Sequence, residues 1–202
     1  MQAADNKPNK YVAYIGIGQV ANTIESEMDS LEYTIDQAQQ AGKQKDVDRL
    51  MRMEESIKSG EDHTPRDLVR KYGGAARLIN DNMDYYKGFL TNPEYNLLDV
   101  IRFVRGVSET QEILLDEEKE NDITTLVKGL DIPLYFVMGK YDYMTSTTAA
   151  RDYYNSVTAP IKDFVVFENS AHYPQFEEEE RFAEWLIQTW KSLEESKTDR
   201  IE

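Results

Sequence analysis

The chain has 202 residues, and its 38 acidic side chains outnumber the 23 basic ones, which gives a formal net charge of −15. A chain this acidic repels nucleic-acid phosphates and anionic lipid surfaces, so the composition argues against a nucleic-acid or membrane-surface partner. The absence of cysteine and the presence of only two histidines exclude disulfides, thiol catalysis and a zinc site built on these two residue types.

No segment approaches the roughly 18 consecutive apolar residues that a membrane-spanning helix requires. Residues 1–7 lack the apolar core of a signal peptide. Together with the absence of cysteine, these features predict a cytoplasmic protein. The length fits one large domain or one domain that carries an insertion.

The first element in chain order is a predicted strand over Tyr11–Gly18. This short apolar run is rich in β-branched and aromatic residues, which is typical of strands buried on both faces in parallel sheets. The polar residues 1–10 before it are expected to be disordered. A buried strand of this kind needs neighbours at both of its edges.

A helical block without strands is predicted from residue 21 to residue 129. Apolar side chains recur there at three- and four-residue spacing, which predicts helices over 25–40, 46–58, 97–103 and 108–115. Another helix start is predicted at Thr64, which would serve as N-cap with Pro65 at the first helical position.

The stretch 72–95 within this block is expected to be irregular, and it is rich in tyrosine. These tyrosines are candidates either for lining a substrate pocket or for half-buried packing, and the sequence leaves both interpretations open. They are Tyr72, Tyr85, Tyr86 and Tyr95.

The α/β pattern returns near residue 132. Apolar runs over 133–138 and 162–167 predict two more buried strands, with a helix over 147–156 between them. An amphipathic helix is predicted over 176–192, with core side chains Phe182, Trp185, Leu186 and Trp190. The charged tail from Glu194 is expected to be frayed. The order of elements predicts an α/β fold with three parallel strands.

The segment Gly16-Ile-Gly18-Gln-Val-Ala21 fits the G-x-G-x-x-A pattern of dinucleotide-binding turns. That pattern requires a second parallel strand after the helix, ending in an acidic residue that holds the ribose. Here the helix is followed by Lys43-Gln-Lys-Asp-Val-Asp, which predicts a further helix instead. We therefore interpret the glycines as permitting a tight turn at the strand end, and no cofactor is expected.

Two candidate catalytic residues follow the last two predicted strands. Asp142 comes after the second strand and a turn-permitting glycine, and His172 comes just after the third strand. Because parallel strands place their carboxyl ends at one edge of the sheet, the carboxylate and the imidazole can form a hydrogen bond there. In such a pair the carboxylate fixes the tautomer and the imidazole acts as a general base.

Two other polar features have plain structural interpretations. His63 lies in the polar segment Ser59-Gly-Glu-Asp-His-Thr-Pro and is expected to be a solvated surface histidine rather than a second base. The acidic run Glu177–Glu180 could bind a cation, but it also opens the last predicted helix. We favour the second interpretation, in which negative charge stabilises the positive end of the helix dipole.

The segments around Asp142 and His172 resemble the acid and histidine loops of proline-iminopeptidase-like α/β-hydrolases, in which the chain order is serine, acid, histidine. The strand over Tyr11–Gly18 looks like the one that follows the nucleophile helix in that family. The resemblance implies three parts: residues 1–20 with the first hydrolase-core strand, 21–130 as a helical cap or lid, and 131–202 as the C-terminal core.

One departure from the family affects the mechanism. The nucleophile motif G-x-S-x-G is absent, and so is a His-Gly oxyanion loop. None of the serines lies between glycines at the required spacing; they are Ser26, Ser30, Ser56, Ser59, Ser108, Ser146, Ser156, Ser170, Ser192 and Ser196. The chain therefore resembles a family member that begins after its nucleophile, with two of the three triad positions.

Two hypotheses follow. In the first, this is the C-terminal part of an aminopeptidase-like or esterase-like hydrolase, inactive alone, and the complete enzyme cleaves a small-molecule ester or a short peptide. In the second, it is a hydrolase-derived protein that binds a ligand or partner without catalysis. A purely helical structural protein fits less well, because both strand-end motifs would lack a role.

The strand over Tyr11–Gly18 would expose an apolar edge in a sheet of three strands. Unpaired edges of this kind recruit other chains. We therefore expect the protein either to self-associate or to depend on a complementing N-terminal half.

Overall fold

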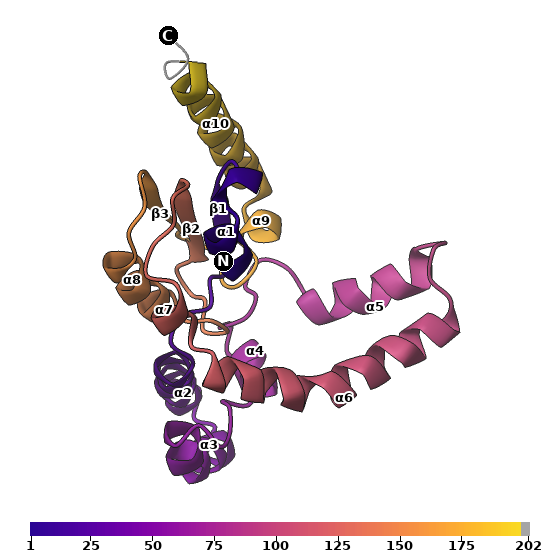
Figure 1. The fold of residues 1–202 in the computed structure, drawn as a ribbon. Coiled ribbons are helices and arrows are strands. Elements are labelled where there is room, and N and C mark those ends of the chain that lie inside the picture. The colour runs from indigo at the N-terminus through magenta and orange to yellow at the C-terminus, as the bar shows by residue number, and fades with distance from the viewer. Residues whose placement is uncertain (199–202) are drawn as a thin grey trace.

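The computed structural model describes residues 1–198, except for the side chains at 81, 82, 84–86, 108, 111, 112, 115, 116, 118–120 and 196–198. Three parallel strands form one sheet in the order β1-β2-β3 (Figure 1). They are β1 (Tyr14–Ile17), β2 (Leu134–Gly139) and β3 (Lys162–Phe167). The predicted α/β fold class is confirmed.

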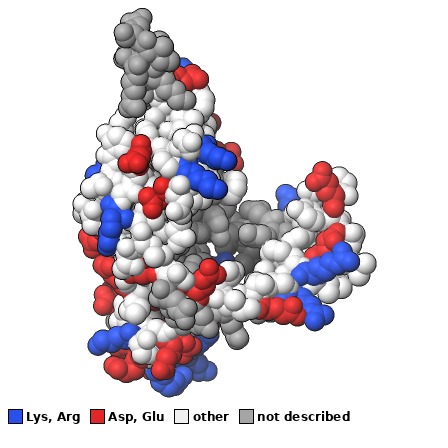
Figure 2. Space-filling view, viewed as in Figure 1, with Lys and Arg blue, Asp and Glu red and all other residues white. Residues whose placement is uncertain are grey.

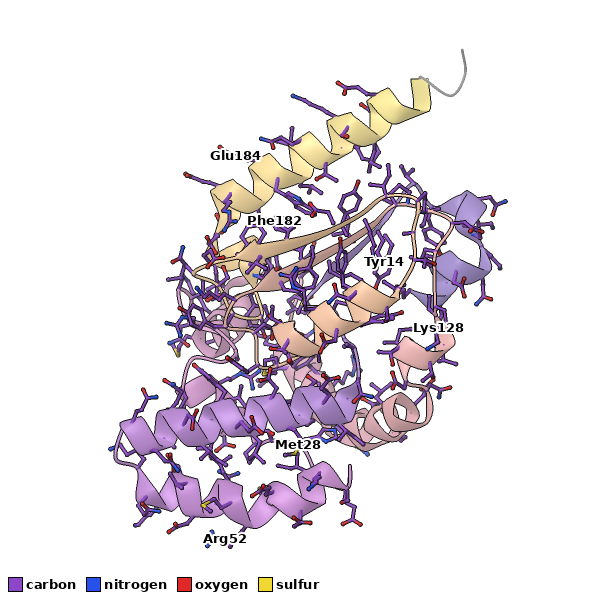
Figure 3. The ribbon with its side chains drawn as sticks, turned by 90° about the vertical axis from the view of Figure 1, so that its left-hand side faces the viewer. Tyr14, Met28, Arg52, Lys128, Phe182 and Glu184 are labelled. Carbon is purple, nitrogen blue, oxygen red and sulfur yellow. The ribbon has the colours of Figure 1, made fainter. Side chains whose placement is uncertain are left out.

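The central strand β2 forms the core of the sheet, and every one of its residues is buried. Helix α8 (Thr147–Ser156) covers one face, where Phe136 packs beside Tyr153 at a ring distance of 5.7 Å. The C-terminal helix covers the other face, and α8 separates the sheet from α2 and α3 (Figure 3). The near-continuous apolar run of β2 follows from this coverage of both faces.

Helices α2 (Thr23–Gln40) and α3 (Gln44–Lys58) pack against each other and confirm the predicted pair. The cluster between them consists of Leu31, Ala38, Val47, Leu50 and Ile57, and Leu68 of the following helix joins it. Both helices begin two residues earlier than the apolar spacing indicated. The Asn22 side chain accepts a hydrogen bond from Glu25 N and caps α2.

The next helix, α4 (Arg66–Lys71), begins one residue later than predicted, with Pro65 as its N-cap. The expectation that Thr64 caps it was wrong. The Thr64 hydroxyl donates instead to the Glu27 carbonyl at 2.9 Å, and its N–H donates to the Glu27 carboxylate at 2.8 Å. Thr64 is therefore hydrogen-bonded to Glu27 on α2 instead of capping α4.

Helices α5 (Asp81–Thr91) and α6 (Leu97–Glu120) form an arm that extends away from the sheet (Figure 1). Two expectations were wrong here: 72–95 is not wholly irregular, and 97–103 and 108–115 belong to one helix. Asn96 starts α6 with a capping box. A single internal glycine costs only about 1 kcal/mol, so Gly106 does not end the helix.

The N-terminal residues are ordered, which corrects the expected disordered leader. They form α1 (Gln2–Asn6) and a short 3-10 helix, η1 (Pro8–Lys10). Ala4 is buried in the apolar cluster around Phe136, and Met1 packs against the same cluster. Ala4 and Met1 are therefore packed in the core although most residues around them in the sequence are polar.

The C-terminal segment is two helices rather than one, α9 (Pro174–Glu177) and α10 (Glu179–Thr198). Trp185 and Phe182 do pack on the sheet side, and Trp185 lies 6.1 Å from Tyr135 between ring centres. Trp190 is 50% exposed and Leu186 39% exposed, so their assignment to the core was wrong. The helix continues past Glu194 to 198, where fraying was expected.

A short helix, α7 (Ile123–Leu126), leads from the arm back to β2. No helix among the described residues is long and apolar enough to cross a membrane. On the face shown in Figure 2, acidic and basic side chains are interspersed over the body and the arm.

The predicted division of the chain into three parts, with boundaries after residues 20 and 130, stays a prediction.

Candidate active site

The acid and histidine loops leave the same edge of the sheet and touch there. Asp142 follows the end of β2 at Gly139, and His172 follows the end of β3 at Phe167. A β-carbon at Gly139 would lie 1.9 Å from the Ala171 carbonyl oxygen. Only glycine allows the two loops to approach so closely, and this approach brings Asp142 and His172 together.

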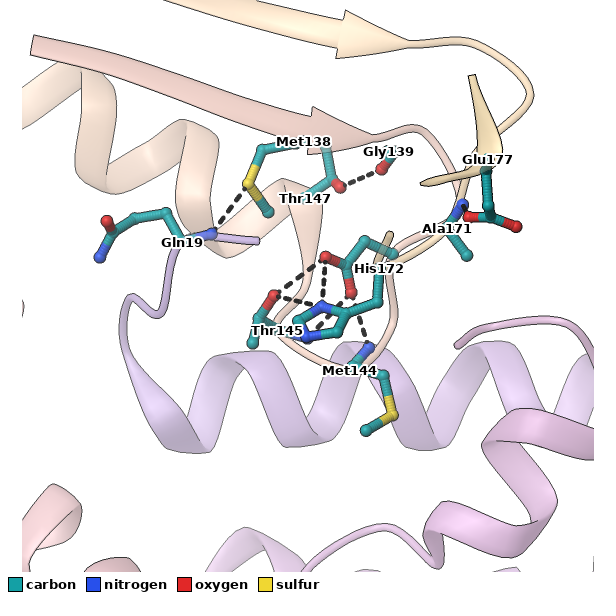
Figure 4. A network of polar contacts seen from close by, with 10 residues as sticks. Gln19, Met138, Gly139, Met144, Thr145, Thr147, Ala171, His172 and Glu177 are labelled. Carbon is teal, nitrogen blue, oxygen red and sulfur yellow. Dashed lines mark hydrogen bonds and ion pairs between the residues drawn. The ribbon is translucent and has the colours of Figure 1, made fainter. Parts of the chain in front are cut away.

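The predicted pair forms a direct hydrogen bond. Nδ1 of His172 lies 3.0 Å from Oδ2 of Asp142 (Figure 4). The Asp142 side chain is fully buried, whereas that of His172 is 24% exposed. Since the ionised carboxylate only accepts, the imidazole proton resides on Nδ1, and Nε2 is left with its lone pair.

Further donors hold the Asp142 carboxylate in place. Oδ1 accepts from Met144 N at 2.9 Å and from Thr145 N at 3.1 Å. Oδ2 accepts from the Thr145 hydroxyl at 3.0 Å in addition to His172. A buried carboxylate requires such partners, because an unpaired charge in the interior is strongly unfavourable. The turn after β2 therefore presents an oriented carboxylate to the imidazole.

The environment raises the pKa of His172 above its usual range. Burial lowers this pKa, but the charge of Asp142 and its hydrogen bond together outweigh the burial. Arg66 and Arg70, on α4, lower it to a smaller extent. The net effect makes the imidazole a stronger base, which suits a group that must accept a proton.

The end of β1 lies against the imidazole. Gly18 has a φ of +58°, and a β-carbon there would lie 2.7 Å from Cε1 of His172. The predicted tight turn at the strand end is confirmed at Gly18, whereas Gly16 lies within β1. The structure adds a second reason for glycine at this position, since any side chain would displace the histidine.

The loop after α4 packs over both site loops and was not recognised in the sequence. The Gly74 carbonyl accepts from Tyr143 N at 2.9 Å, and the Ala75 carbonyl accepts from His172 N at 3.0 Å. The rings of Tyr33 and Tyr143 stack at 3.7 Å between centres. The pair Gly73-Gly74 was the available signal, because adjacent glycines permit close backbone approach.

His63 is not joined to this site by any recorded contact. It is half-buried rather than solvated, and its Nε2 is buried without a hydrogen-bond partner among the described residues. The expectation of a solvated surface histidine was therefore wrong. The polar segment around it gave no sign of this burial.

Among the described residues, no serine is hydrogen-bonded to the imidazole of His172, whose ring partners are Asp142 and Thr145. The buried Ser146 hydroxyl donates to Asp29, and the Ser170 hydroxyl donates to Glu178. The side chains of Ser108 and Ser196 lie outside the described residues. Within the described part of the chain, Nε2 of His172 has no recorded hydrogen-bond partner.

The tyrosines of the stretch 72–95 do not gather around the dyad in the described residues. The Tyr72 hydroxyl donates to Asp46 at 2.6 Å, and Tyr95 packs beside Phe89 at 5.5 Å between ring centres. Both contacts favour the packing interpretation. The side chains of Tyr85 and Tyr86 lie outside the described residues.

The acidic run divides into two roles. Glu179 and Glu180 lie in the first turn of α10, as the dipole argument predicted. Glu177 is different, because it is buried and accepts backbone hydrogen bonds from the nearby histidine loop and from the distant loop after α4. Its assignment to the opening of the last helix was wrong.

The chain is similar to two proteins whose names describe them as peptidases. It is 26% identical over 192 residues to the probable aminopeptidase YbaC of Bacillus subtilis (strain 168), spanning 92% of this chain and 59% of that protein. It is 36% identical over 88 residues to the proline iminopeptidase of Heyndrickxia coagulans, spanning 44% of this chain and 29% of that protein. These relatives support an α/β-hydrolase-like relationship.

The chain therefore spans less than two thirds of the length of either relative. No protein-family model matches it. The chain is also similar to a crystal structure of VinJ, with 28% sequence identity over 37% of this chain and 23% of the VinJ chain. The TM-score of 0.29 is too low to support a statement about the fold.

Proposed function

We propose that this chain supplies the acid and the histidine of an α/β-hydrolase that cleaves ester or peptide bonds, with an aminopeptidase-like or esterase-like activity. The single observation that carries the proposal is the 3.0 Å hydrogen bond between the buried Asp142 and His172. Two backbone donors and the Thr145 hydroxyl orient the acid. The peptidase relatives support the same reaction class.

In this proposal His172 is the general base and then the general acid. Its Nε2 takes the proton of a serine hydroxyl as the serine oxygen bonds to the carbonyl carbon of the substrate. The same proton passes to the leaving alcohol or amine, and water releases the acyl group by the reverse path. Asp142 holds the imidazole and stabilises its protonated form.

The serine and the oxyanion donors would come from a complementing segment. The sequence has no G-x-S-x-G motif, and the oxyanion donors are usually the largest electrostatic contribution to such reactions. We therefore propose that this chain alone is inactive. A strand that paired with β1 in parallel would have its carboxyl end on the same side of the sheet as His172.

The free edge of β1 supports this location. Tyr14 and Gly18 donate their N–H groups to Pro133 and Val137 of the neighbouring segment, at 2.8 and 3.0 Å. Because a strand alternates its backbone direction, Ile15 and Ile17 direct their N–H and C=O groups away from β2. β1 has no second strand neighbour among the described residues.

A cavity beside β1 and exposed apolar side chains on the arm support the proposal of a complementing segment. A cavity of about 480 Å³ runs along this edge, lined by residues 14–21 with Met1, Thr23, Asn121 and Ile123. On the arm, Leu90 is 84% exposed and Leu97 75% exposed. Large exposed apolar surfaces of this kind are typical of interaction sites.

The test is complementation with the part of the Bacillus subtilis relative that this chain does not match. The two pieces are co-expressed and labelled with a fluorophosphonate probe, and hydrolysis of an aminoacyl p-nitroanilide is followed. We expect a single adduct on the added piece, and no adduct on the 23.4 kDa chain alone.

His172→Ala in the complemented pair serves as the control and should abolish labelling. An adduct on this chain alone would contradict the proposal, because one of its own serines would then be the nucleophile. Labelling that survives His172→Ala would remove the base role of His172.

The absence of the nucleophile motif favours one alternative, a hydrolase-derived protein that binds a ligand or partner without catalysis. Ligand binding would then raise the unfolding temperature with no product formed. Thermal unfolding with aminoacyl amides and esters, followed by mass analysis for product, separates the two functions.

A further inference from the structure

Glu177 is a buried acid outside the dyad with an unusual set of partners. It is the last residue of α9 and is only 8% exposed. Oε2 accepts from Ala171 N at 2.7 Å, and Oε1 accepts from Leu78 N at 2.8 Å and from Arg77 N. Figure 4 shows the Glu177 carboxylate directed at the Ala171 amide, on the backbone just before His172.

These donors belong to two loops that are far apart in the sequence. Arg77 and Leu78 follow α4, and Ala171 lies in the histidine loop. A carboxylate can serve both loops because each of its oxygens is an acceptor only. Hydrogen bonds from backbone N–H groups to a charged acceptor are about twice as strong as neutral ones.

The same two loops are joined once more beside the imidazole. His172 donates its own N–H to the Ala75 carbonyl at 3.0 Å. Ala171 and His172 are therefore each tied to the loop after α4, one through Glu177 and one directly. This double attachment fixes the backbone from which the imidazole reaches Asp142.

We propose that Glu177 is a positioning residue for His172, holding the histidine loop against the loop 75–78 so that Nδ1 stays in hydrogen-bond contact with Asp142. Its relevance to catalysis rests on the proposed hydrolase function. The positioning itself does not, because it can be measured on the isolated chain.

Glu177→Gln is the sharpest variant. Glutamine has the same shape, but its amide nitrogen donates and cannot accept. One of the two loops therefore faces a donor where it had an acceptor. Glu179→Gln is the matched control, since it removes the same charge from the exposed neighbouring position in the first turn of α10.

The readout is the NMR titration of His172, which is straightforward because the chain has only His63 and His172. Burial, Asp142 and the arginines Arg66 and Arg70 govern the pKa of His172. We expect Glu177→Gln to lower that pKa, since contact with Asp142 weakens while burial and the arginines persist. Glu179→Gln should leave it unchanged.

A lowered unfolding temperature with an unchanged His172 titration would overturn the proposal, because Glu177 would then be only structural. Should Glu177→Gln not fold, Glu177→Asp takes its place. Aspartate keeps the charge but is too short to serve both loops, and the same fall in the His172 pKa is expected.

Amide exchange in the unmodified chain tests the contact without any variant. We expect the amides of Leu78 and Ala171 to exchange as slowly as those of β2, and about 10- to 100-fold faster in Glu177→Gln. Exchange of both amides at the rate of exposed loops in the unmodified chain would overturn the proposal.

The two proposals fail separately. If complementation yields no hydrolysis but Glu177→Gln still lowers the pKa of His172, the positioning holds and the hydrolase assignment falls. If the complemented enzyme is active, Glu177→Gln should lower kcat with little change in KM and shift the acid limb of its pH profile. Activity with an unaltered profile would remove Glu177 from the mechanism.

Discussion

The backbone of Gly18 lies against the imidazole of His172, so that a β-carbon at Gly18 would stand 2.7 Å from Cε1 of the ring. This relationship connects the first strand of the sheet to a loop that follows the last one. It means that the position of the histidine depends on a glycine more than 150 residues before it in the chain.

Gly18→Ala should destabilise the fold and displace His172. The left-handed φ of +58° costs about 1–2 kcal/mol for alanine, and the steric conflict with the ring adds to this. Gly42→Ala is the control, because its φ of +65° is similar but its surroundings are open. Urea unfolding and the His172 NMR signals measure the difference, and equal losses in both variants would contradict it.

Asp142→Asn should lower the pKa of His172. Burial already lowers this pKa, and only the charge and hydrogen bond of Asp142 reverse the effect. The chemical shift of the imidazole Cε1 proton, followed from pH 5 to pH 9, gives the result directly. In a complemented, active enzyme the same change should lower kcat by about 10⁴-fold. A His172 pKa that stays high would mean that Asp142 does not control it.

The dyad should make stability depend on pH in one direction. The pKa of His172 is raised above its unfolded value of 6.5, so the folded state binds the proton more tightly. The stabilisation that the protonated His172 gives to the folded state is fully present below pH 6.5. It is lost as the pH rises through the pKa of His172 in the folded state. The free energy of unfolding of the native chain minus that of His172→Gln should therefore shrink from pH 5.5 to pH 8.5. A difference that grows with pH would contradict the ion pair.

Ile17→Lys should reduce association at the free edge of β1 without unfolding the chain. Ile17 is 39% exposed, and charges on edge strands oppose pairing with other chains. We expect the purified chain to self-associate when no complementing segment is present, and the variant to shift toward monomer in sedimentation velocity. Met51→Lys, on the exposed side of α3, is the control and should change nothing. A native chain that sediments as a clean monomer would contradict this expectation.

Local signals were sufficient for most of the fold. The positions of the three strands, the pair α2 and α3, and helix α8 follow from apolar spacing, because burial imposes that spacing directly. The predicted burial held fully only for β2. β1 is shorter than the predicted strand over Tyr11–Gly18 and Ile17 is 39% exposed, and β3 is mostly half-buried, so the expectation of burial was wrong for these two strands. The pair of Asp142 and His172 was also accessible. Each residue follows a buried strand, and parallel strands must place their carboxyl ends together.

Tertiary structure alone decided the features whose partners lie far along the chain. The polar leader is ordered because Ala4 packs in the cluster around Phe136. Thr64 does not cap α4, because its hydroxyl and its N–H are hydrogen-bonded to Glu27 on α2. Glu177 accepts from the amide of Leu78, which lies 99 residues before it, rather than opening the last helix, for the same reason. Local patterns record which face of an element is buried, but they contain no information about which distant backbone group an isolated polar side chain will meet.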